Sequence, residues 1–498
     1  MAIFPESVTI FLICTLVMMC MKILINLKEK KKKYNFPPGP TPLPFIGNMH
    51  ILDIKRQDFT FMKLAKKYGP FFTFHLGSSK AVVLVGYDVN QEALVKGYYD
   101  FGDRGAIPIS DSHQNNHGVI FGNGEKWKMT RRFTLSILRD LGMGKRTIED
   151  RIIEELHYLN ELIASFKGNP FHKQELYNPT PNIIFNILFG RRFDYKDPTF
   201  RKILDIIDDV VILCGCPSAK YFNVFPVLKY FLKTPKIVIK KIDELNVILQ
   251  ELFKQAQEAK CDDFFRTYSE AFLQKQEKEK EYDEKDKIYT EKNLLASTFD
   301  LILGGTETTT LTLQWAILMM MKYPDIQKKV HDEIEHVIGL ERPPRWEDQK
   351  VLPYCLAVVH ETQRFGNILQ YLSHSTPTDV CFRGYTIPKG TTVIPLFTSI
   401  LYDETHWKTP WQFNPDHFLD ANGKFLKRDE FFAFSKGRRV CAGESLARME
   451  LFMFFTGMLQ KFTFLPPPGV KREDLDLTGD PHFLTKPQDF HVCAIPKA

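Results

Sequence analysis

The chain has 498 residues, of which 44% are hydrophobic and 25% are charged, and its formal net charge is +6. So small an excess of positive charge argues against a nucleic-acid-binding protein and suits a surface that faces anionic lipid or an acidic partner. Nine cysteines without a regular paired spacing indicate reduced thiols facing the cytosol, which excludes a disulfide-stabilised secreted domain and a cysteine-rich zinc site.

The N-terminus has the composition of a membrane anchor. The stretch from Ile3 to Leu27 is mostly apolar and reaches the roughly 20 residues that a spanning helix needs. Lysines 28 and 30–33 follow at once, and the positive-inside rule keeps them on the cytoplasmic side. Because Glu6 lies near the start of the chain and lysines follow the apolar stretch, a cleaved signal peptide and a buried core helix both fit poorly. We expect an uncleaved anchor over residues 1–27.

A basic and proline-rich hinge is expected over residues 28–45. It contains the segment Phe36-Pro-Pro-Gly-Pro-Thr-Pro-Leu-Pro44, and prolines hold such a segment extended and semi-rigid. We expect residues 46–498 to form one large domain, because they show no internal repeat. The dense charge run Lys275 to Lys287 suits a solvated loop or helix end that joins two helices.

Helical patterns outweigh strand patterns in this domain. Phe71 to Gly77 and Ala81 to Gly86 have the character of short strands separated by a turn, and Thr376 to Pro395 alternates turns with β-formers. Acidic and apolar residues at helical spacing predict helices over Thr147 to Ala164 and Lys236 to Ala259. The sequence therefore predicts a mainly α fold with a small β region.

Two further segments each allow two interpretations. Tyr221 to Leu232 is unusually aromatic, which fits either ordinary core or a second membrane contact beside the anchor. Trp127 and Arg131 place an indole N–H and a guanidinium one helical turn apart, where both can bind a carboxylate. The same two residues are equally compatible with an ordinary basic helix face.

A long central helix is predicted from Thr290, which can cap its start, to Lys322, just before a proline. The adjacent glycines Gly304-Gly305 lie in its interior, where each costs about 1 kcal/mol relative to alanine. They indicate either a kink for close helix packing or a widened groove where a ligand crosses the helix. Glu307 and Thr308 supply an acid and an alcohol beside that groove, and such a pair can relay protons.

An acid and a base lie three residues apart on a second helix, which begins at Pro353 and ends near Gly366. This spacing places Glu361 and Arg364 on one face. Taken alone, the pair is most simply a surface ion pair.

The most informative segment is Phe434-Ser-Lys-Gly-Arg-Arg-Val-Cys-Ala-Gly443. Its cysteine, Cys441, lies in a turn after two arginines and before an apolar helical run. The arginines and the helix N-terminus both favour a thiolate, which is the form that binds a metal. Gly437 and Gly443 allow a flat cofactor to approach the backbone closely.

In this spacing the segment resembles the haem-binding loop of the cytochromes P-450, the haem-thiolate monooxygenases. Every fixed position of that pattern matches: Phe, two residues, Gly, one, Arg, one, Cys, one, Gly. The resemblance covers essentially the whole chain and is closest to the microsomal vertebrate drug- and fatty-acid-metabolising type. Other segments in the same style are Asp103-Arg-Gly, Phe121-Gly-Asn-Gly, Gly142-Met-Gly-Lys-Arg and Arg383-Gly-Tyr-Thr-Ile-Pro-Lys-Gly-Thr. The resemblance implies the cytochrome P-450 fold, with one large catalytic domain that follows an N-terminal transmembrane anchor.

The resemblance implies haem b as the cofactor and Cys441 as its axial iron ligand. The other residues implied to bind haem, through its propionates or as part of the loop, are Trp127, Arg131, Arg439, His374, Phe434, Gly437 and Gly443. The chain is one residue shorter before His374 than close relatives, and Gln370 replaces a proline that they usually carry. In the family, the pair Glu361 and Arg364 locks the core behind the haem, with His417 at the position of the usual third member.

The activity implied is monooxygenation of lipophilic substrates such as xenobiotics, fatty acids or steroids. Glu307 and Thr308 would handle protons during O2 activation, and the substrate cavity would be lined by Phe121, Leu303, Gly304, Leu369 and Phe483. Electrons would come from NADPH through NADPH-cytochrome P-450 reductase, with cytochrome b5 as a second partner, at the endoplasmic reticulum membrane with the catalytic domain in the cytoplasm. Basic residues that suit an acidic partner are Lys128, Arg132, Lys145, Lys436 and Arg438.

Two other functions stay open at this point. One is a haem-thiolate isomerase or dehydratase that rearranges lipid peroxides without a reductase. The other is a non-catalytic haem-binding membrane protein.

Overall fold

The structure, a computed structural model, describes residues 34–258, 265–283 and 287–497. The expected anchor over residues 1–27 and the lysines of the hinge lie outside these residues. Within the described part of the chain, no helix has both the length and the apolar character needed to cross a membrane.

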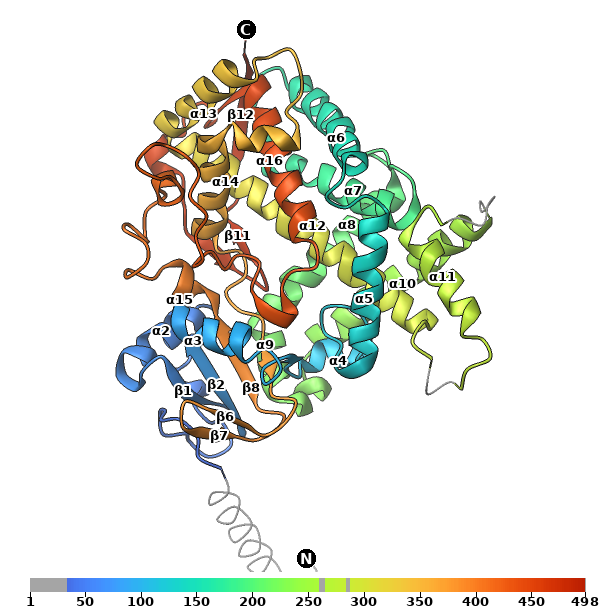
Figure 1. The fold of residues 1–498 in the computed structure, drawn as a ribbon, viewed down its shortest axis with the longest axis vertical. Helices are drawn as coiled ribbons and strands as arrows, with labels where there is room; N and C mark the ends of the chain where they lie inside the picture. The colour runs from blue at the N-terminus through green and yellow to red at the C-terminus, as the bar shows by residue number, and fades with distance from the viewer. Residues whose placement is uncertain (1–33, 259–264, 284–286, 498) are drawn as a thin grey trace, which may run out of the picture.

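Helices form most of the molecule and surround α12, the long yellow helix at its centre (Figure 1). α12 packs against α7, α14 and α16. The helices are α2 (Gln57–Tyr68), α3 (Tyr87–Gln91), α4 (Pro108–Gln114), α5 (Gly124–Asp140), α6 (Arg146–Ser165), α7 (Pro179–Phe189), α8 (Pro198–Gly215), α9 (Pro217–Val224), α10 (Thr234–Glu258), α11 (Tyr268–Lys278), α12 (Glu291–Lys322), α13 (Pro324–Val337), α14 (Pro353–Gly366), α15 (Phe397–Leu401) and α16 (Glu444–Lys461). α6, α10, α12 and α14 confirm helices that the sequence predicts, and α16 confirms the apolar helical run after Cys441.

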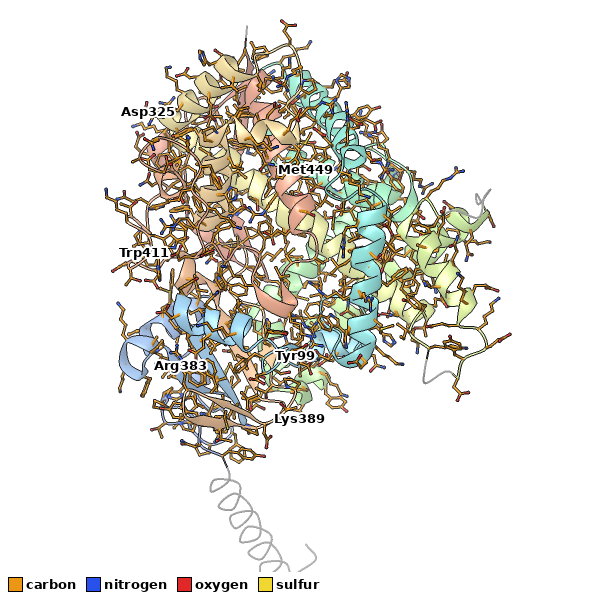
Figure 2. All side chains as sticks on the ribbon, in the orientation of Figure 1. Tyr99, Asp325, Arg383, Lys389, Trp411 and Met449 are labelled. Carbon is orange, nitrogen blue, oxygen red and sulfur yellow. The ribbon has the colours of Figure 1, made fainter. Side chains whose placement is uncertain are left out.

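Local sequence explains both ends of α12. The Asn293 N–H donates to Thr290 Oγ1 at 3.2 Å, so Thr290 is the N-cap that the sequence predicts. The helix stops at Lys322 because Pro324 starts the next helix and disfavours helical geometry in the residue before it. Side chains fill the space around the central helices, and Met449 of α16 lies in the middle of this packing (Figure 2).

The largest sheet lies at one end of the molecule, in the blue part of Figure 1. Its strand order is β1 (Phe71–Leu76), β2 (Ser79–Val85), β8 (Thr392–Leu396), β5 (His374–Ser375) and β3 (Asp103–Arg104). β1 and β2 confirm the two strands predicted after the hinge. Successive residues of a strand point to opposite faces. Val82 and Leu84 join one apolar cluster whereas Ala81 and Val83 join another, so both faces of the sheet are buried.

Smaller sheets complete the β region. They are β4 (Phe171–His172) with β12 (His491–Pro496) and β9 (Phe462–Leu465), the hairpin β6 (Val380–Phe382) with β7 (Tyr385–Ile387), and the pair β10 (Gly479–Pro481) with β11 (Thr485–Pro487). The β-rich segment predicted over residues 376–395 therefore divides between a separate hairpin and β8, which runs parallel to β2 in the main sheet.

The pair Glu361 and Arg364 is fully buried, which excludes the surface ion pair. The two guanidinium nitrogens facing the carboxylate donate to it at 2.7 Å, and Arg364 also donates to three backbone carbonyls between residues 401 and 412. His417 Nδ1 lies 3.2 Å from both oxygens of Glu361 and takes the third place in the cluster. α14 is thereby tied to the long connection that leads to the Cys441 loop.

Candidate active site

Cys441 stands between a short 3₁₀ turn, η7 (Gly437–Arg439), and the N-terminus of α16. The Cys441 N–H donates to the Phe434 carbonyl at 3.0 Å, which closes the turn. Gly437 has a φ of +78°, and a Cβ there would lie 1.8 Å from the Leu94 carbonyl oxygen, so the loop requires glycine at this point. A Cβ on Gly443 would meet nothing within 4 Å, so this glycine borders open space.

The Cys441 side chain is not covered by other side chains of the protein. The residue is exposed, yet the surrounding protein desolvates the thiol and raises its pKa. A hydrogen bond from the Gly443 N–H and the charges of Arg131 and Arg448 act in the opposite direction and favour the thiolate. The sequence suggests that the two arginines just before Cys441 stabilise its charge. In the structure this role falls to arginines of α5 and α16.

The side chain of Arg439 points away from the thiol. It donates at 2.8 Å to the carbonyls of Gly102 and Gly122, and its guanidinium lies 3.4 Å from the centre of the Trp127 ring. The Trp127 indole N–H donates to the Val119 carbonyl at 2.9 Å, and Arg131 donates to the Val440 carbonyl. These predicted haem-binding residues are therefore brought together at the Cys441 loop, where their bonds to backbone hold the surrounding segments in place.

Two buried groups beside this cluster have nitrogens without partners. Arg104 and His374 are paired residues of β3 and β5. Arg104 Nη1 and His374 Nε2 are buried and have no hydrogen-bond partner among the described residues. The His374 Nδ1–H donates to the Phe101 carbonyl at 2.7 Å. His374 therefore lies at the site even though the connection that precedes it is one residue shorter than in close relatives.

The cationic cluster beside the Cys441 loop contains more positive than negative charge. Burial and the charges of neighbouring arginines together lower the pKa of Arg104 to about 9 and that of Arg439 to about 8, and the charges of Asp300 and Asp103 offset these shifts only in part. Burial, followed by the charge of Arg104, also lowers the pKa of His374. An anion placed here would relieve all three groups. The sequence offers only one sign of Arg104, the Asp103-Arg-Gly segment, and gives no indication that a strand pairs it with His374.

The two glycines of α12 have different surroundings. A Cβ on Gly305 would lie 2.4 Å from Ile184 Cδ1 of α7, so this glycine permits close helix packing. A Cβ on Gly304 would meet only Ile120 Cδ1, at 3.8 Å, so this glycine keeps one helix face open. Both interpretations of the glycine pair therefore hold, one for each residue. Thr308 lies one turn further on, and its hydroxyl donates to the Gly304 carbonyl at 2.7 Å.

Glu307 and Thr308 do not share a face of α12, because successive helical residues are about 100° apart. Glu307 is fully buried and accepts a hydrogen bond from the Tyr177 hydroxyl at its Oε1, while Oε2 has no partner among the described residues. Burial raises the pKa of Glu307 to about 7 and raises the pKa of Tyr177 as well, so the phenol stays protonated as the donor. Nothing in the local sequence marks Tyr177 as the partner of Glu307.

An apolar cavity of about 420 Å³ adjoins α12 at Phe299 and Leu303. Among the predicted cavity residues, Phe121, Leu303 and Phe483 line it, whereas Gly304 and Leu369 do not. Lining residues that the sequence did not reveal include Ile109, His113, Val210, Lys220, Phe299, Tyr371 and Ile394. This volume lies within the usual range of roughly 300–1,000 Å³ for small-molecule sites.

These groups fit an iron porphyrin. The thiol at the start of α16 is a soft ligand for iron. The cationic cluster, with its unpaired Arg104 and His374 nitrogens, suits the two carboxylates of such a cofactor. The space beside Gly443 and the open face at Gly304 leave its flat body unobstructed at both points.

Comparisons with known proteins lead to the same chemistry. The family model described as cytochrome P450 matches residues 37–494. The chain is 44% identical to human cytochrome P450 2W1 over 93% of this chain and 94% of that protein. It is 45% identical to cytochrome P450 2K4 of Oncorhynchus mykiss, over 92% and 91%, and 40% identical to rat cytochrome P450 2C23, over 96% and 97%. The chain therefore belongs to the cytochrome P450 family of haem-thiolate monooxygenases, among its family-2 members.

Proposed function

We propose that the protein inserts one oxygen atom from O2 into lipophilic substrates, with electrons from NADPH supplied by a separate reductase. The observation that carries the proposal is the Cys441 thiol, which borders open space at the start of α16 within a fold that also holds an apolar cavity. One oxygen atom enters a C–H bond or double bond of the substrate. The other becomes water, with consumption of two electrons and two protons.

Each group of the site has a distinct role in the proposed reaction. Haem, when bound, supplies the iron that binds and cleaves dioxygen. Cys441 would hold the iron as a thiolate, and electron donation from such a ligand favours O–O cleavage. Glu307 can exchange a proton near neutral pH, because burial raises its pKa to about 7, and Thr308 presents a hydroxyl at the open face of α12.

Binding of the two propionates is assigned to the cationic cluster. Arg104 and His374 offer unpaired nitrogens, so we add Arg104 to the residues that the sequence predicts. Trp127, Arg131 and Arg439 complete the cluster. Phe434, Gly437 and Gly443 give the loop its shape.

An acidic redox partner would bind the surface formed by α5 and the loop that follows it. Lys128, Arg132 and Lys145 are exposed there. Lys436 and Arg438 are partly buried: Lys436 donates to the Asp429 carbonyl at 2.5 Å, and Arg438 lies 5.2 Å from the centre of the Trp127 ring. The exposed residues are the better candidates for contact with the reductase or cytochrome b5.

We further propose that residues 1–27 anchor the protein in the endoplasmic reticulum membrane, with residues 28–45 as the hinge and residues 46–498 as the cytoplasmic catalytic domain. Large apolar side chains of the described residues support a second contact with the bilayer. They gather in two exposed segments, with Leu43, Phe45 and Ile46 in the hinge region and Val227, Tyr230 and Phe231 after α9.

The first test is the carbon monoxide difference spectrum of the reduced protein, wild type beside Cys441→Ser. We expect a strongly red-shifted Soret band that is lost in the variant, because only a thiolate ligand produces that shift. A band at the position of histidine-ligated haem in the folded wild type would contradict the assignment of Cys441.

The same preparation then tests the reaction. We expect substrate oxidation only when reductase and NADPH are both present, and more peroxide released per NADPH in Thr308→Ala. Turnover of a lipid peroxide without reductase would instead indicate an isomerase or dehydratase. A haem-thiolate spectrum without any turnover would indicate a non-catalytic haem protein.

A further inference from the structure

The cavity is lined by a lysine and by no acidic residue. Lys220 of α9 contributes to its wall, whereas no aspartate or glutamate of the described residues does so. Two histidines, His113 and His482, also line it. Burial lowers the pKa of His113, and His482 is engaged by Asp480 at 2.9 Å. Lys220 is therefore the main source of charge in an otherwise largely apolar space.

The Lys220 ammonium is only partly satisfied. Its Nζ donates to the Ile54 carbonyl at 3.0 Å, and it forms no ion pair with a carboxylate of the described residues. The nearest acids are already engaged. Asp58 pairs with Arg56 at 2.9 Å, and Asp53 accepts the N–H groups of Lys55 and Arg56 at 2.9 and 3.1 Å. An ammonium has three donors, so Lys220 can still donate to an anion.

Lys220 lies on α9, which packs against η4 (Pro226–Tyr230), an exposed part of the cavity wall. Ser79 and Pro226, which also line the cavity, are exposed. Pro226 begins η4, the segment whose apolar side chains are exposed. Other parts of the lining come from α12, through Phe299 and Leu303. The cavity thus runs between a cation near an apolar surface and the helix that carries Thr308.

A cation in an otherwise largely apolar wall suits an amphiphile with an anionic head. Charge-assisted hydrogen bonds from lysine to a carboxylate are stronger than bonds between neutral groups. A neutral lipophile would leave the Lys220 ammonium without an anionic partner in a partly buried site, which costs free energy.

We propose that Lys220 binds the carboxylate of a long-chain lipophilic acid and directs its hydrocarbon chain through the cavity toward α12. The substrates are therefore long-chain acids. Because the carboxylate is held at Lys220 and the chain extends toward α12, oxidation occurs at carbons remote from the carboxylate. The proposal rests on the proposed monooxygenase function, since that function supplies the oxidation.

Binding tests the proposal without turnover. Equilibrium dialysis would compare dodecanoic acid with its methyl ester, which has the same chain without the charge. Lys220→Gln keeps an N–H donor for the Ile54 carbonyl and removes the charge. We expect it to weaken binding of the acid about tenfold and to leave the ester unchanged. Lys220→Arg should retain the preference for the acid.

Lys229→Gln is the matched control, because Lys229 is exposed on η4 and does not line the cavity. It should bind acid and ester as the wild type does. Equal loss of acid and ester affinity in Lys220→Gln, or no loss in either, would overturn the role of Lys220. If Lys220→Gln fails to fold, the wild type decides: a wild type that binds the ester as tightly as the acid overturns the proposal.

Product analysis provides the second measurement. With reductase and NADPH, the wild type should oxidise dodecanoic acid near its methyl end, and Lys220→Gln should spread oxidation along the chain. If the wild type oxidises the ester but not the acid, the preference for the acid is refuted and the monooxygenase function is not. If the wild type shows no haem-thiolate band, the monooxygenase function itself is refuted. The dialysis result would still report whether Lys220 binds the acid.

Discussion

Glu307 is a buried acid whose pKa is set by burial and by three neighbours, Lys486, Asp208 and Tyr177. Its side chain is fully buried beside the Tyr177 hydroxyl, which donates to Oε1. Burial raises the pKa of Glu307 to about 7, whereas the hydrogen bond from Tyr177 and the charge of Lys486 lower it. A pKa of about 7 allows Glu307 to give up and regain a proton near neutral pH, which suits an acid that supplies protons during turnover.

Replacing Tyr177 by Phe should shift the pH dependence of coupling, measured as product formed per NADPH consumed. In the wild type, coupling should fall as the pH rises through about 7, because Glu307 loses the proton it would donate. Without the hydrogen bond, the pKa of Glu307 rises, so the fall should move to higher pH by roughly half to one unit.

Glu307→Gln is the control for this experiment, because its amide does not titrate in this range. It should show low coupling without the pH step. A Tyr177→Phe profile that coincides with that of the wild type would show that Tyr177 does not set the protonation of Glu307.

The site residues that were predictable from sequence lie close together along the chain, whereas the others join the site through contacts with distant segments. Cys441 and Gly437 stand in one short loop, so their spacing alone indicates the chemistry. Arg104 joins the site because β3 pairs with β5, far away along the chain. Tyr177 reaches Glu307 from η3 (Lys173–Tyr177), a contact across 130 positions of sequence. Single-sequence patterns carry no record of such pairings.

At the scale of elements, α12 combines close packing on one face with open space on another. Gly305 meets Ile184 of α7, and Gly304 meets only the tip of Ile120. The helix and its cap were predictable because they depend on local signals, namely Thr290 at the start and Pro324 after the end. Which glycine serves packing and which serves the open face was not predictable, since it depends on the neighbouring helix.

Alanine substitutions should separate the two glycines. Gly305→Ala should destabilise the protein by about 1–3 kcal/mol, because its Cβ would lie 2.4 Å from Ile184 Cδ1. Gly304→Ala should be neutral or stabilising by up to about 1 kcal/mol, because alanine favours helix and its Cβ has room. The midpoint of thermal loss of the haem-thiolate spectrum measures both.

The double variant Gly305→Ala with Ile184→Ala provides the check. It should be more stable than the sum of the two single changes implies, because the smaller side chain at 184 removes the clash. Purely additive effects would mean that Gly305 is required for a reason other than contact with α7.

At the scale of the whole molecule, two exposed apolar segments belong to one side of the protein. Phe45 is 85% exposed and Phe231 is 79% exposed. Within the aromatic segment Tyr221 to Leu232, Phe222 belongs to the core, so the core interpretation holds for that residue and not for the exposed Val227, Tyr230 and Phe231. The β1–β2 turn connects the two segments. Gly47 bridges to Leu76 in that turn, and a Cβ on the neighbouring Gly77 would meet Phe225 at 2.9 Å. Exposed apolar groups gathered in this way are typical of a membrane-binding surface.

Tryptophan placed at this surface should report contact with lipid. In vesicles containing brominated phosphatidylcholine, the full-length Phe231→Trp protein should lose more fluorescence than the wild type, because bromine quenches only indoles that reach the acyl chains. Tyr282→Trp is the matched control, since Tyr282 is 57% exposed and follows α11, outside both apolar segments. The native tryptophans contribute the same background to both variants. Equal quenching of the two variants would mean that the N-terminal anchor alone holds the protein at the bilayer. Selective quenching of Phe231→Trp would place the apolar surface in the lipid, next to the part of the cavity wall where Lys220 lies.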